Sequence, residues 1–445
     1  MKIALISPTG AMHRYDGSFG KALHYAPLTL TTLAALVPPE LEAEVVIYDE
    51  SVEKIPLDLD ADIIGITAIT GTSVRAYRYA DYFRSKGIFT VLGGVHPSML
   101  PAEASAHADA VFVGIADDTW PEFLRGFAAK RSLKKIYHQN DNVSLAGRPF
   151  PRRELLKKSG YSTINTVEAI RGCTLPCTFC AYPAAFGSKL YKRPVKDVLQ
   201  EIEQLKGKMV LFPDVNLLAD RQYALELFKG MIPLKKWWFG LVTSSIGEDK
   251  ELIHVFQKSG CKGVLIGFES LSQGAQSYIK KGINHVGNYE LLMKRLHNAG
   301  IAVNGCFAFG GDDDYLDVFD RTVEMIIKLK IDLPRFSVLT PFPGTQLYRE
   351  LLAQDRIFEL DYAMYDVEHV VFGPKNMTAE QLHAGLERAW RVTYEYSSIL
   401  KRLAYWKSLF PIAIPTNIAY RNYADKFALF TKEVMTDNSY IPEKK

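Results

Sequence analysis

Three of the five cysteines of this 445-residue chain fall within eight positions, and this spacing constrains the chain more than any other feature. Residues 171–180 place Cys173, Cys177 and Cys180 in a Cys-x3-Cys-x2-Cys pattern. Three thiolates on one loop are suited to bind three irons of a four-iron, four-sulfur cluster, which leaves the fourth iron without a protein ligand. An open metal position is where chemistry takes place. The loop therefore predicts a reactive iron–sulfur centre, and Gly172 would let the backbone approach it closely.

Two simpler uses of these cysteines fit the sequence less well. A closed zinc site needs a fourth ligand, usually from a second short-spaced Cys/His pair, and the sequence shows no such pair. Disulfides are typical of small secreted proteins, whereas this chain is long and opens on a strand-like pattern at residues 1–7 instead of a signal peptide. We therefore expect a reducing, cytoplasmic location.

The cysteine loop resembles the signature of the radical S-adenosylmethionine (SAM) superfamily, including the aromatic Phe179 before the last cysteine. The resemblance implies that Cys173, Cys177 and Cys180 are the metal ligands and that Phe179 lies at the SAM site. In that family the amino and carboxylate groups of SAM chelate the open iron, and an electron from the cluster cleaves SAM to a 5′-deoxyadenosyl radical. It also implies an electron donor such as flavodoxin or ferredoxin.

The first 140 residues alternate short apolar segments with helical patterns, which predicts an open, mostly parallel α/β sheet. The expected strands are 3–7, 44–48, 62–67, 89–93 and 110–114, and 73–86 is an expected helix. The small and polar residues follow the strands, where ligands bind in such sheets. A dinucleotide site is disfavoured because the G-x-G-x-x-G fingerprint is absent.

The loops after these strands resemble the Rossmann-like cobalamin-binding domain that precedes the barrel in one branch of the radical SAM superfamily. The resemblance implies cobalamin contacts from Thr70, Gly71, Thr72, Gly93, Gly94, His96 and Gly114. The D-x-H-x-x-G motif is absent, so cobalamin would bind without a lower histidine ligand, and residues 115–117 depart from the family's usual acidic pattern. His96 is then a cofactor-facing residue or an ordinary capping histidine. Alternatively, the domain has kept the fold and lost the corrinoid.

Residues 141–164 lack periodicity and carry prolines and a basic cluster, so they are expected to link two domains. Residues 165–348 then give six strand candidates, which predict a partial (β/α)6 barrel with functional loops at the strand ends. The candidates are 167–170, 209–213, 238–243, 263–268, 302–309 and 336–340, with helices such as 195–205 and 288–298 between them. The cysteine loop follows the first candidate and so falls at the functional face.

Several polar or small residues at these strand ends resemble SAM-contacting positions of the family. They are Asp214 and Asn216 after the second strand, Glu269 and Ser270 after the fourth, and Gly310 after the fifth. A carboxylate at Asp214 would accept hydrogen bonds from the SAM ammonium, and Glu269 would bind ribose hydroxyls or a polar substrate group. Individually, acidic residues at turns are also common as solvated caps. The proline-rich stretch 340–348 matches the branch's closing motif.

Residues 349–445 are expected to be mostly helical. The apolar stretch 409–420 contains two prolines and is too short to span a bilayer, so it either packs over the barrel or covers a lipid-like substrate. A net charge of +3, from 53 basic and 50 acidic residues, gives no reason to propose nucleic acid as a partner. We expect a monomer without a transmembrane segment.

The leading hypothesis is a radical SAM enzyme that uses cobalamin to modify an unactivated carbon of a small-molecule or lipid-like metabolite, by methylation. A second hypothesis is rearrangement, cyclisation or oxidation without methyl transfer. A third is a non-enzymatic iron–sulfur sensor or scaffold, which predicts no 5′-deoxyadenosine above a cysteine-to-alanine control.

Overall fold

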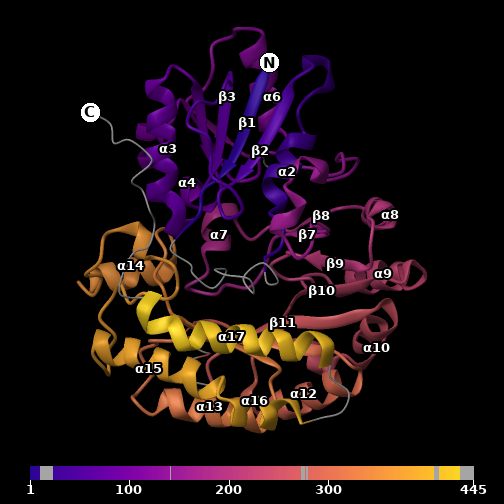
Figure 1. The fold of residues 1–445 in the computed structure, drawn as a ribbon, viewed down its shortest axis with the longest axis vertical. Coiled ribbons are helices and arrows are strands. Elements are labelled where there is room, and N and C mark those ends of the chain that lie inside the picture. The colour runs from indigo at the N-terminus through magenta and orange to yellow at the C-terminus, as the bar shows by residue number, and fades with distance from the viewer. Residues whose placement is uncertain (11–23, 141, 272–275, 277–278, 405–409, 431–445) are drawn as a thin grey trace.

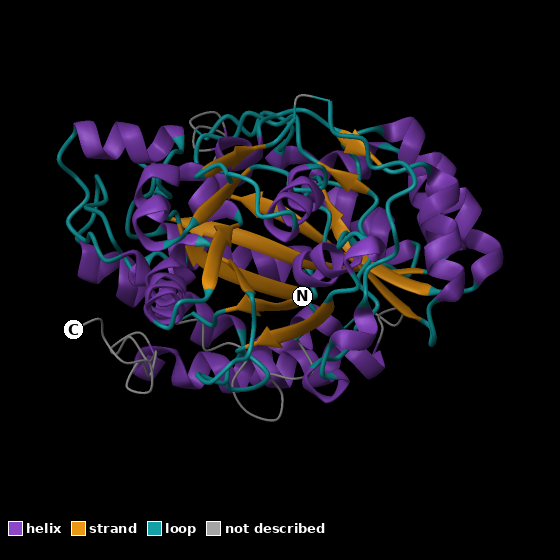
Figure 2. Ribbon diagram, turned by 90° about the horizontal axis from the view of Figure 1, so that it is seen from above, coloured by secondary structure: helices purple, strands orange, loops and turns teal. Residues whose placement is uncertain are grey.

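The computed structural model describes residues 1–10, 24–140, 142–271, 276, 279–404 and 410–430. Two parallel β-sheets lie one above the other, and the short elements β7, β8 and α7 lie between them (Figure 1). The strands of the upper sheet come from residues 2–138 and those of the lower sheet from residues 209–338. Helices surround both sheets (Figure 2).

The N-terminal sheet has six parallel strands in the order β2-β1-β3-β4-β5-β6. Alternating apolar residues of β1 face opposite ways: Ile3 and Leu5 join one core, whereas Ala4 and Ile6 join the other. A strand that is apolar on both faces requires helices on both sides. The strands are β1 (Lys2–Ser7), β2 (Glu44–Asp49), β3 (Ile63–Thr67), β4 (Phe89–Gly93), β5 (Ala110–Val113) and β6 (Ile136–His138); the helices are α2 (Leu28–Ala35), α3 (Ser73–Ser85), α4 (Val95–Met99), α5 (Pro101–His107) and α6 (Thr119–Ala128).

The lower sheet has five parallel strands in the order β13-β12-β11-β10-β9. The strands are β9 (Met209–Phe212), β10 (Trp237–Val242), β11 (Cys261–Glu269), β12 (Ala302–Phe309) and β13 (Leu333–Val338); the helices are α8 (Val195–Gln204), α9 (Arg221–Met231), α10 (Lys250–Ser259), α12 (Tyr289–Asn298) and α13 (Val318–Leu329). The predicted fold class, an α/β sheet domain followed by a partial barrel, is confirmed.

The first of the six predicted barrel strands is not a full strand. Only Thr166 forms a parallel bridge, to Leu211 of β9. The backbone N–H groups of Ala169 and Ile170 donate instead to the Asp214 carboxylate, so they are not available for a sheet ladder. The chain turns there into a short antiparallel pair, β7 (Ile170–Arg171) and β8 (Tyr191–Lys192).

The C-terminal helices α14 (Gln346–Ala353), α15 (Ala379–Thr393), α16 (Tyr396–Leu403) and α17 (Phe410–Phe430) follow the barrel. One continuous apolar core runs from the barrel strands into α15 and α17, so residues on both sides of position 348 pack together. The division into 1–140, 141–164, 165–348 and 349–445 stays a proposal. Residue 409, the first of the apolar stretch 409–420, lies outside the described residues. Among the helices that the structure describes, none combines the length and apolarity needed to cross a membrane.

Arg402 fixes α16 to the barrel from a fully buried position. Its guanidinium donates to the backbone carbonyls of Ile331, Asp332 and Thr393 at 3.0, 2.9 and 3.1 Å, and to Oδ1 of Asn417 at 2.9 Å. Of these four acceptors, the Asp332 carbonyl also accepts from Asn417 Nδ2 at 3.1 Å. The Arg402 contacts therefore connect α15, α17 and the two residues before β13.

We predict that Arg402→Met lowers the free energy of unfolding by about 3 kcal/mol, because buried carbonyls lose their donor. The matched control is Arg388→Met on α15, whose ion pair with Asp320 is more than half exposed and should cost less than about 1 kcal/mol. Urea denaturation followed by circular dichroism measures both. Equal losses in the two variants would contradict this role of Arg402.

Candidate active site

The cysteine loop lies between β7 and α7 (Ala181–Phe186), in the space where the two sheets approach each other (Figure 1). Two distant segments hold it at its middle: Thr178 N donates to Ile279 O at 3.2 Å, and Leu347 N donates to Thr178 O at 3.0 Å. A tight turn joins the last two cysteines, with Cys180 N donating to Cys177 O at 3.2 Å. The loop is therefore positioned by residues more than 90 positions away in sequence.

Gly172 adopts a backbone conformation that favours glycine and lies close to a neighbouring chain segment. Its φ is +126°, and a Cβ there would lie 2.3 Å from the carbonyl oxygen of Lys189 and 3.1 Å from the Cα of Leu190. The close approach is thus to the chain segment that enters β8. This glycine allows the cysteine loop to pack against that segment.

The three thiols are half-buried and reduced. Burial raises the pKa of Cys177 to about 12, and the nearby Lys281 ammonium opposes this effect. Burial likewise raises the pKa of Cys180. Within the described residues, no three His, Cys, Asp or Glu side chains converge on one metal ion. Three thiols on one loop match a four-iron cluster, which is bound through one thiolate per iron.

A buried ion pair that the sequence analysis missed lies beside this loop. The Lys281 ammonium is 2.5 Å from Oε1 of Glu269 at the end of β11. Both groups lie over Gly267, where a Cβ would be 2.2 Å from the carboxylate and 2.5 Å from the ammonium. Burial lowers the pKa of Lys281, but the charges of Glu269 and Cys177 outweigh this and raise it, so the ammonium stays charged. The signal available in the sequence was a Lys-Lys-Gly run shortly after the fourth strand.

Asp214 is fully buried, and its Oδ1 accepts hydrogen bonds from the backbone of Ala169 (2.9 Å) and Ile170. Its Oδ2 is also buried and has no hydrogen-bond partner in the described part of the chain. Asn216, the neighbouring predicted residue, places Nδ2 4.0 Å from Sγ of Cys173. The turn after β9 thus reaches the cysteine loop and holds one unused acceptor there.

The remaining residues predicted to contact SAM are Gly310, Ser270 and Phe179. Gly310 N donates to the buried Asp314, and a Cβ at Gly310 would meet Leu382 at 2.9 Å, so this glycine permits helix packing. Ser270 lies at the rim, where its carbonyl accepts from Gln276 at 2.5 Å. Phe179 is partly buried against the barrel core. The structure brings Asp214, Asn216 and Glu269 to the cysteine loop and leaves Gly310 on the C-terminal side.

The predicted cobalamin residues gather at the carboxyl ends of β3, β4 and β5. His96 is completely buried, with Nδ1 3.3 Å from Thr70 Oγ1 and Nε2 3.2 Å from Glu103 Oε1. Both ring nitrogens of His96 are therefore engaged within the domain. Two of the glycines leave no room for a side chain: a Cβ at Gly94 would be 2.7 Å from Ala68 O, and one at Gly114 would be 2.3 Å from Gln139 Oε1. Gly93 and Thr72 lie on the same edge, and Gly71 contacts residues 365–366.

Two cavities open near this edge. A small apolar one of about 50 Å³ lies between the sheet and helices α2 and α6; its lining includes Leu5, Leu30, Gly65, Val91, Phe112 and Trp120. A larger one of about 290 Å³ is lined by Thr9, His24, Asp49, Gly71, Tyr365 and Asp366, among others. The edge therefore offers two cavities, and the larger one combines a mostly apolar surface with polar side chains, which suits an amphipathic ligand.

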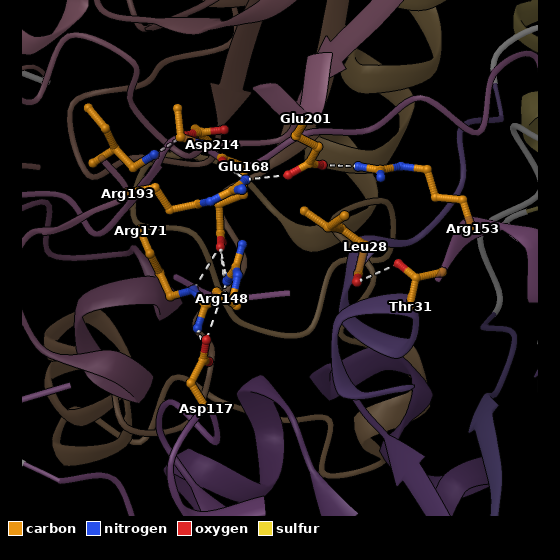
Figure 3. A network of polar contacts seen from close by, with 12 residues as sticks. Leu28, Thr31, Asp117, Arg148, Arg153, Glu168, Arg171, Arg193, Glu201 and Asp214 are labelled. Carbon is orange, nitrogen blue, oxygen red and sulfur yellow. Dashed lines mark hydrogen bonds and ion pairs between the residues drawn. The ribbon is translucent and has the colours of Figure 1, made fainter. Parts of the chain in front are cut away.

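Four buried charges connect this edge to the cysteine loop (Figure 3). Arg171 donates to Asp117 Oδ2 at 2.6 Å and to both oxygens of Glu168 at 2.7 and 2.9 Å. Arg148 donates to Asp117 Oδ1 at 3.3 Å and to Glu168 Oε2 at 2.9 Å. Burial raises the pKa of Glu168, but the charges of Arg171 and Arg148 outweigh it and lower the value to about 2.

The comparisons with known proteins agree with this geometry. The model of the radical SAM superfamily matches residues 167–326. A bacteriochlorophyllide d C-12(1)-methyltransferase of Chlorobaculum tepidum is 33% identical over 390 residues, which cover 85% of this chain and 84% of the relative. The chain belongs to the radical SAM superfamily. As a radical SAM enzyme it uses a four-iron, four-sulfur cluster and SAM.

Two further likenesses extend over nearly the whole chain. The bacteriochlorophyllide d C-8(2)-methyltransferase of Chlorobaculum tepidum is 29% identical over 427 residues, covering 92% of this chain and 93% of the relative. The structure of the radical SAM methyltransferase TsrM from Kitasatospora setae, with cobalamin and a [4Fe-4S] cluster bound, matches with a TM-score of 0.70 at 16% identity, covering 96% of this chain and 99% of that one. This radical SAM chain and TsrM share one fold from end to end.

We predict that Gly172→Ala prevents stable cluster assembly, because the new methyl group collides with the backbone of Lys189. Iron and sulfide after anaerobic reconstitution should fall well below the expected four or so of each per chain. Gly187→Ala is the matched control: its φ is also positive, at +75°, but a Cβ there meets nothing within 4 Å among the described residues. Similar iron contents in the two variants would contradict the steric explanation.

A second prediction concerns pH. Burial, together with the charge of Glu168, raises the pKa of Asp214 to about 7, from an ordinary 3.8. The folded state therefore holds a proton that the unfolded chain releases, and this contribution to stability is full below about pH 4 and is lost as the pH rises towards 7. Asp214→Asn keeps the acceptor oxygen but has no proton to lose. Relative to wild type, the apoprotein variant should gain up to about 1.4 kcal/mol of unfolding free energy per pH unit between about pH 5 and 7, measured by urea denaturation. A constant difference would contradict the raised pKa.

Proposed function

We propose that this radical SAM enzyme is a cobalamin-dependent methyltransferase that methylates an unactivated carbon of a small molecule. One observation carries the proposal: the cysteine loop lies between the two sheets, joined through Arg171 to Asp117 on the loop after β5. The carboxyl-end loops of an α/β sheet are where its ligands bind. Two cofactor sites on opposite sides of one space provide the arrangement that methyl transfer to a carbon radical needs.

The residues present fit the cluster and SAM. We assign Cys173, Cys177 and Cys180 to the cluster, and Asp214, Asn216, Glu269, Ser270, Phe179 and Gly310 to the SAM site. Lys281 joins them, because a buried ammonium beside Cys177 matches the carboxylate of SAM. The unpartnered Asp214 Oδ2 is a ready acceptor for the SAM ammonium. When bound, the cluster supplies an electron to SAM and cobalamin supplies the methyl group.

The N-terminal edge fits a corrinoid held without a protein ligand to cobalt. The residues that we assign to the corrinoid lie at the carboxyl ends of β3, β4 and β5, where the ligands of such a sheet bind: Thr70, Gly71, Thr72, Gly93, Gly94 and Gly114. A small apolar cavity lies beside them. His96 contacts this edge through Thr70. Because His96 is buried, we assign it the role of positioning Thr70.

For the substrate we propose a small molecule, with a chlorophyll-type tetrapyrrole as the first compound to test, because the two relatives described above are named for bacteriochlorophyllide d. A low-potential flavodoxin or ferredoxin would reduce the cluster. We further propose that the enzyme acts as a monomer in the cytoplasm, where a reducing environment preserves the thiolates.

The test uses SAM carrying a deuterated methyl group, with bacteriochlorophyllide d as substrate and anaerobically reconstituted protein. We expect hydroxocobalamin to bind with about one corrinoid per chain, 5′-deoxyadenosine to form, and a three-deuterium mass gain in the product. The Cys173→Ala, Cys177→Ala, Cys180→Ala triple variant is the control and should form neither product.

Three results would each remove a different part of the proposal. A wild-type protein that binds no corrinoid removes cobalamin. Formation of 5′-deoxyadenosine with an altered but unlabelled product favours rearrangement, cyclisation or oxidation instead. No conversion of bacteriochlorophyllide d, with SAM still cleaved, removes only this tetrapyrrole.

A further inference from the structure

The four charges at the junction of the two sheets form a closed ring of alternating sign. Asp117 and Glu168 each accept from both Arg148 and Arg171, so every charge has two opposite neighbours. The side chains are mostly hidden from solvent, with exposed fractions of 8% for Asp117, 2% for Arg148, 15% for Glu168 and 17% for Arg171. Salt and water therefore screen the ring weakly.

The ring joins three separate parts of the chain. Asp117 lies on the loop after β5, beside the edge to which we assign cobalamin, and Arg148 lies in the segment between the sheets. Glu168 lies two residues before β7, and Arg171 ends this strand two residues before Cys173. The 2.6 Å contact between Arg171 and Asp117 is thus the shortest in the ring, and it crosses from one cofactor region to the other.

A buried ring of this kind is a poor source of net stability, because desolvating the charges cancels much of their attraction. Its value is geometric, since a planar guanidinium that binds two carboxylates fixes both their distance and their direction. We propose that the Asp117–Arg171 ion pair is a positioning contact that sets the distance between the cobalamin site and the iron–sulfur cluster. This inference rests on the proposed function, because it assumes two cofactors.

Asp117→Asn is the test variant, because it removes one charge and keeps the size of the side chain. Asp117→Glu keeps the charge and should restore much of the wild-type behaviour. The matched control is Glu50→Gln, which breaks an equally buried carboxylate–arginine pair, with Arg75, that lies wholly within the N-terminal sheet domain. Comparing the variants separates loss of a buried charge from loss of the connection between the sheets.

The first measurement uses the apoprotein and needs no cofactor. Hydrogen exchange of the Ile170 amide, which is bonded to Asp214 on the barrel side, should become at least about tenfold faster in Asp117→Asn. Glu50→Gln should leave this amide unchanged, even if amides around β2 exchange faster. An unchanged Ile170 amide in Asp117→Asn overturns the inference.

The second measurement uses protein loaded with hydroxocobalamin, reduced to its paramagnetic Co(II) state, and with the reduced cluster. Pulsed electron paramagnetic resonance should give one narrow distance between the two centres in wild type, Asp117→Glu and Glu50→Gln, and a broadened or shifted one in Asp117→Asn. SAM cleavage in Asp117→Asn should stay within about twofold of wild type, which shows that the barrel is intact. An identical distance distribution in Asp117→Asn overturns the inference.

The two measurements also distinguish this inference from the proposed function. If wild-type protein binds no corrinoid, the proposed function fails, and the assignment of the distance to cobalamin falls with it. If wild-type protein binds corrinoid and all variants behave alike, the proposed function stands and only the positioning role of Asp117 is removed.

Discussion

Charge neutralisation at the junction of the two sheets is the constraint on which the site depends. Asp117, Arg148, Glu168 and Arg171 are all largely removed from water, and an unpaired charge in such a place is costly. Because the four come from three parts of the chain, pairing them requires the loop after β5, the connecting segment and β7 to meet. The cysteine loop begins immediately after Arg171, so its place between the sheets follows from that meeting.

The barrel side of the junction is built around a second buried acid. Asp214 accepts hydrogen bonds from two backbone N–H groups that would otherwise extend a sixth barrel strand. The chain therefore leaves the sheet at this point and turns into the cysteine loop. Burial, and after it the charge of the nearby Glu168, raises the pKa of Asp214. Lys281 balances the other end, where Glu269 would be an isolated buried charge. Each of these buried groups is thus stabilised by the ion pair or hydrogen bonds that it forms with its neighbours.

Most of the fold was predictable because strands that are buried on both faces leave long apolar runs, as β1 and β3 do. The strand β6 was missed because three residues, one of them an exposed histidine, give no periodic pattern. The candidate strand 167–170 was misjudged for another reason. Its apolar side chains are buried as predicted, but the backbone N–H groups of Ala169 and Ile170 bond to the side chain of Asp214. Propensity describes side chains, and it cannot tell where the backbone hydrogen bonds go.

The sequence by itself determined the chemistry of this protein, because cysteine spacing is a local property and three thiolates within eight residues can serve few purposes. It also determined the two α/β units, through local periodicity. Only the tertiary structure decided how those units meet. The pairing of Arg171 with Asp117, of Lys281 with Glu269 and of Asp214 with the backbone before the cysteines depends on contacts between distant residues. The positions of charged side chains in the sequence show no periodicity from which their partners could be predicted. Their pairing follows from burial, which exists only once the chain has folded.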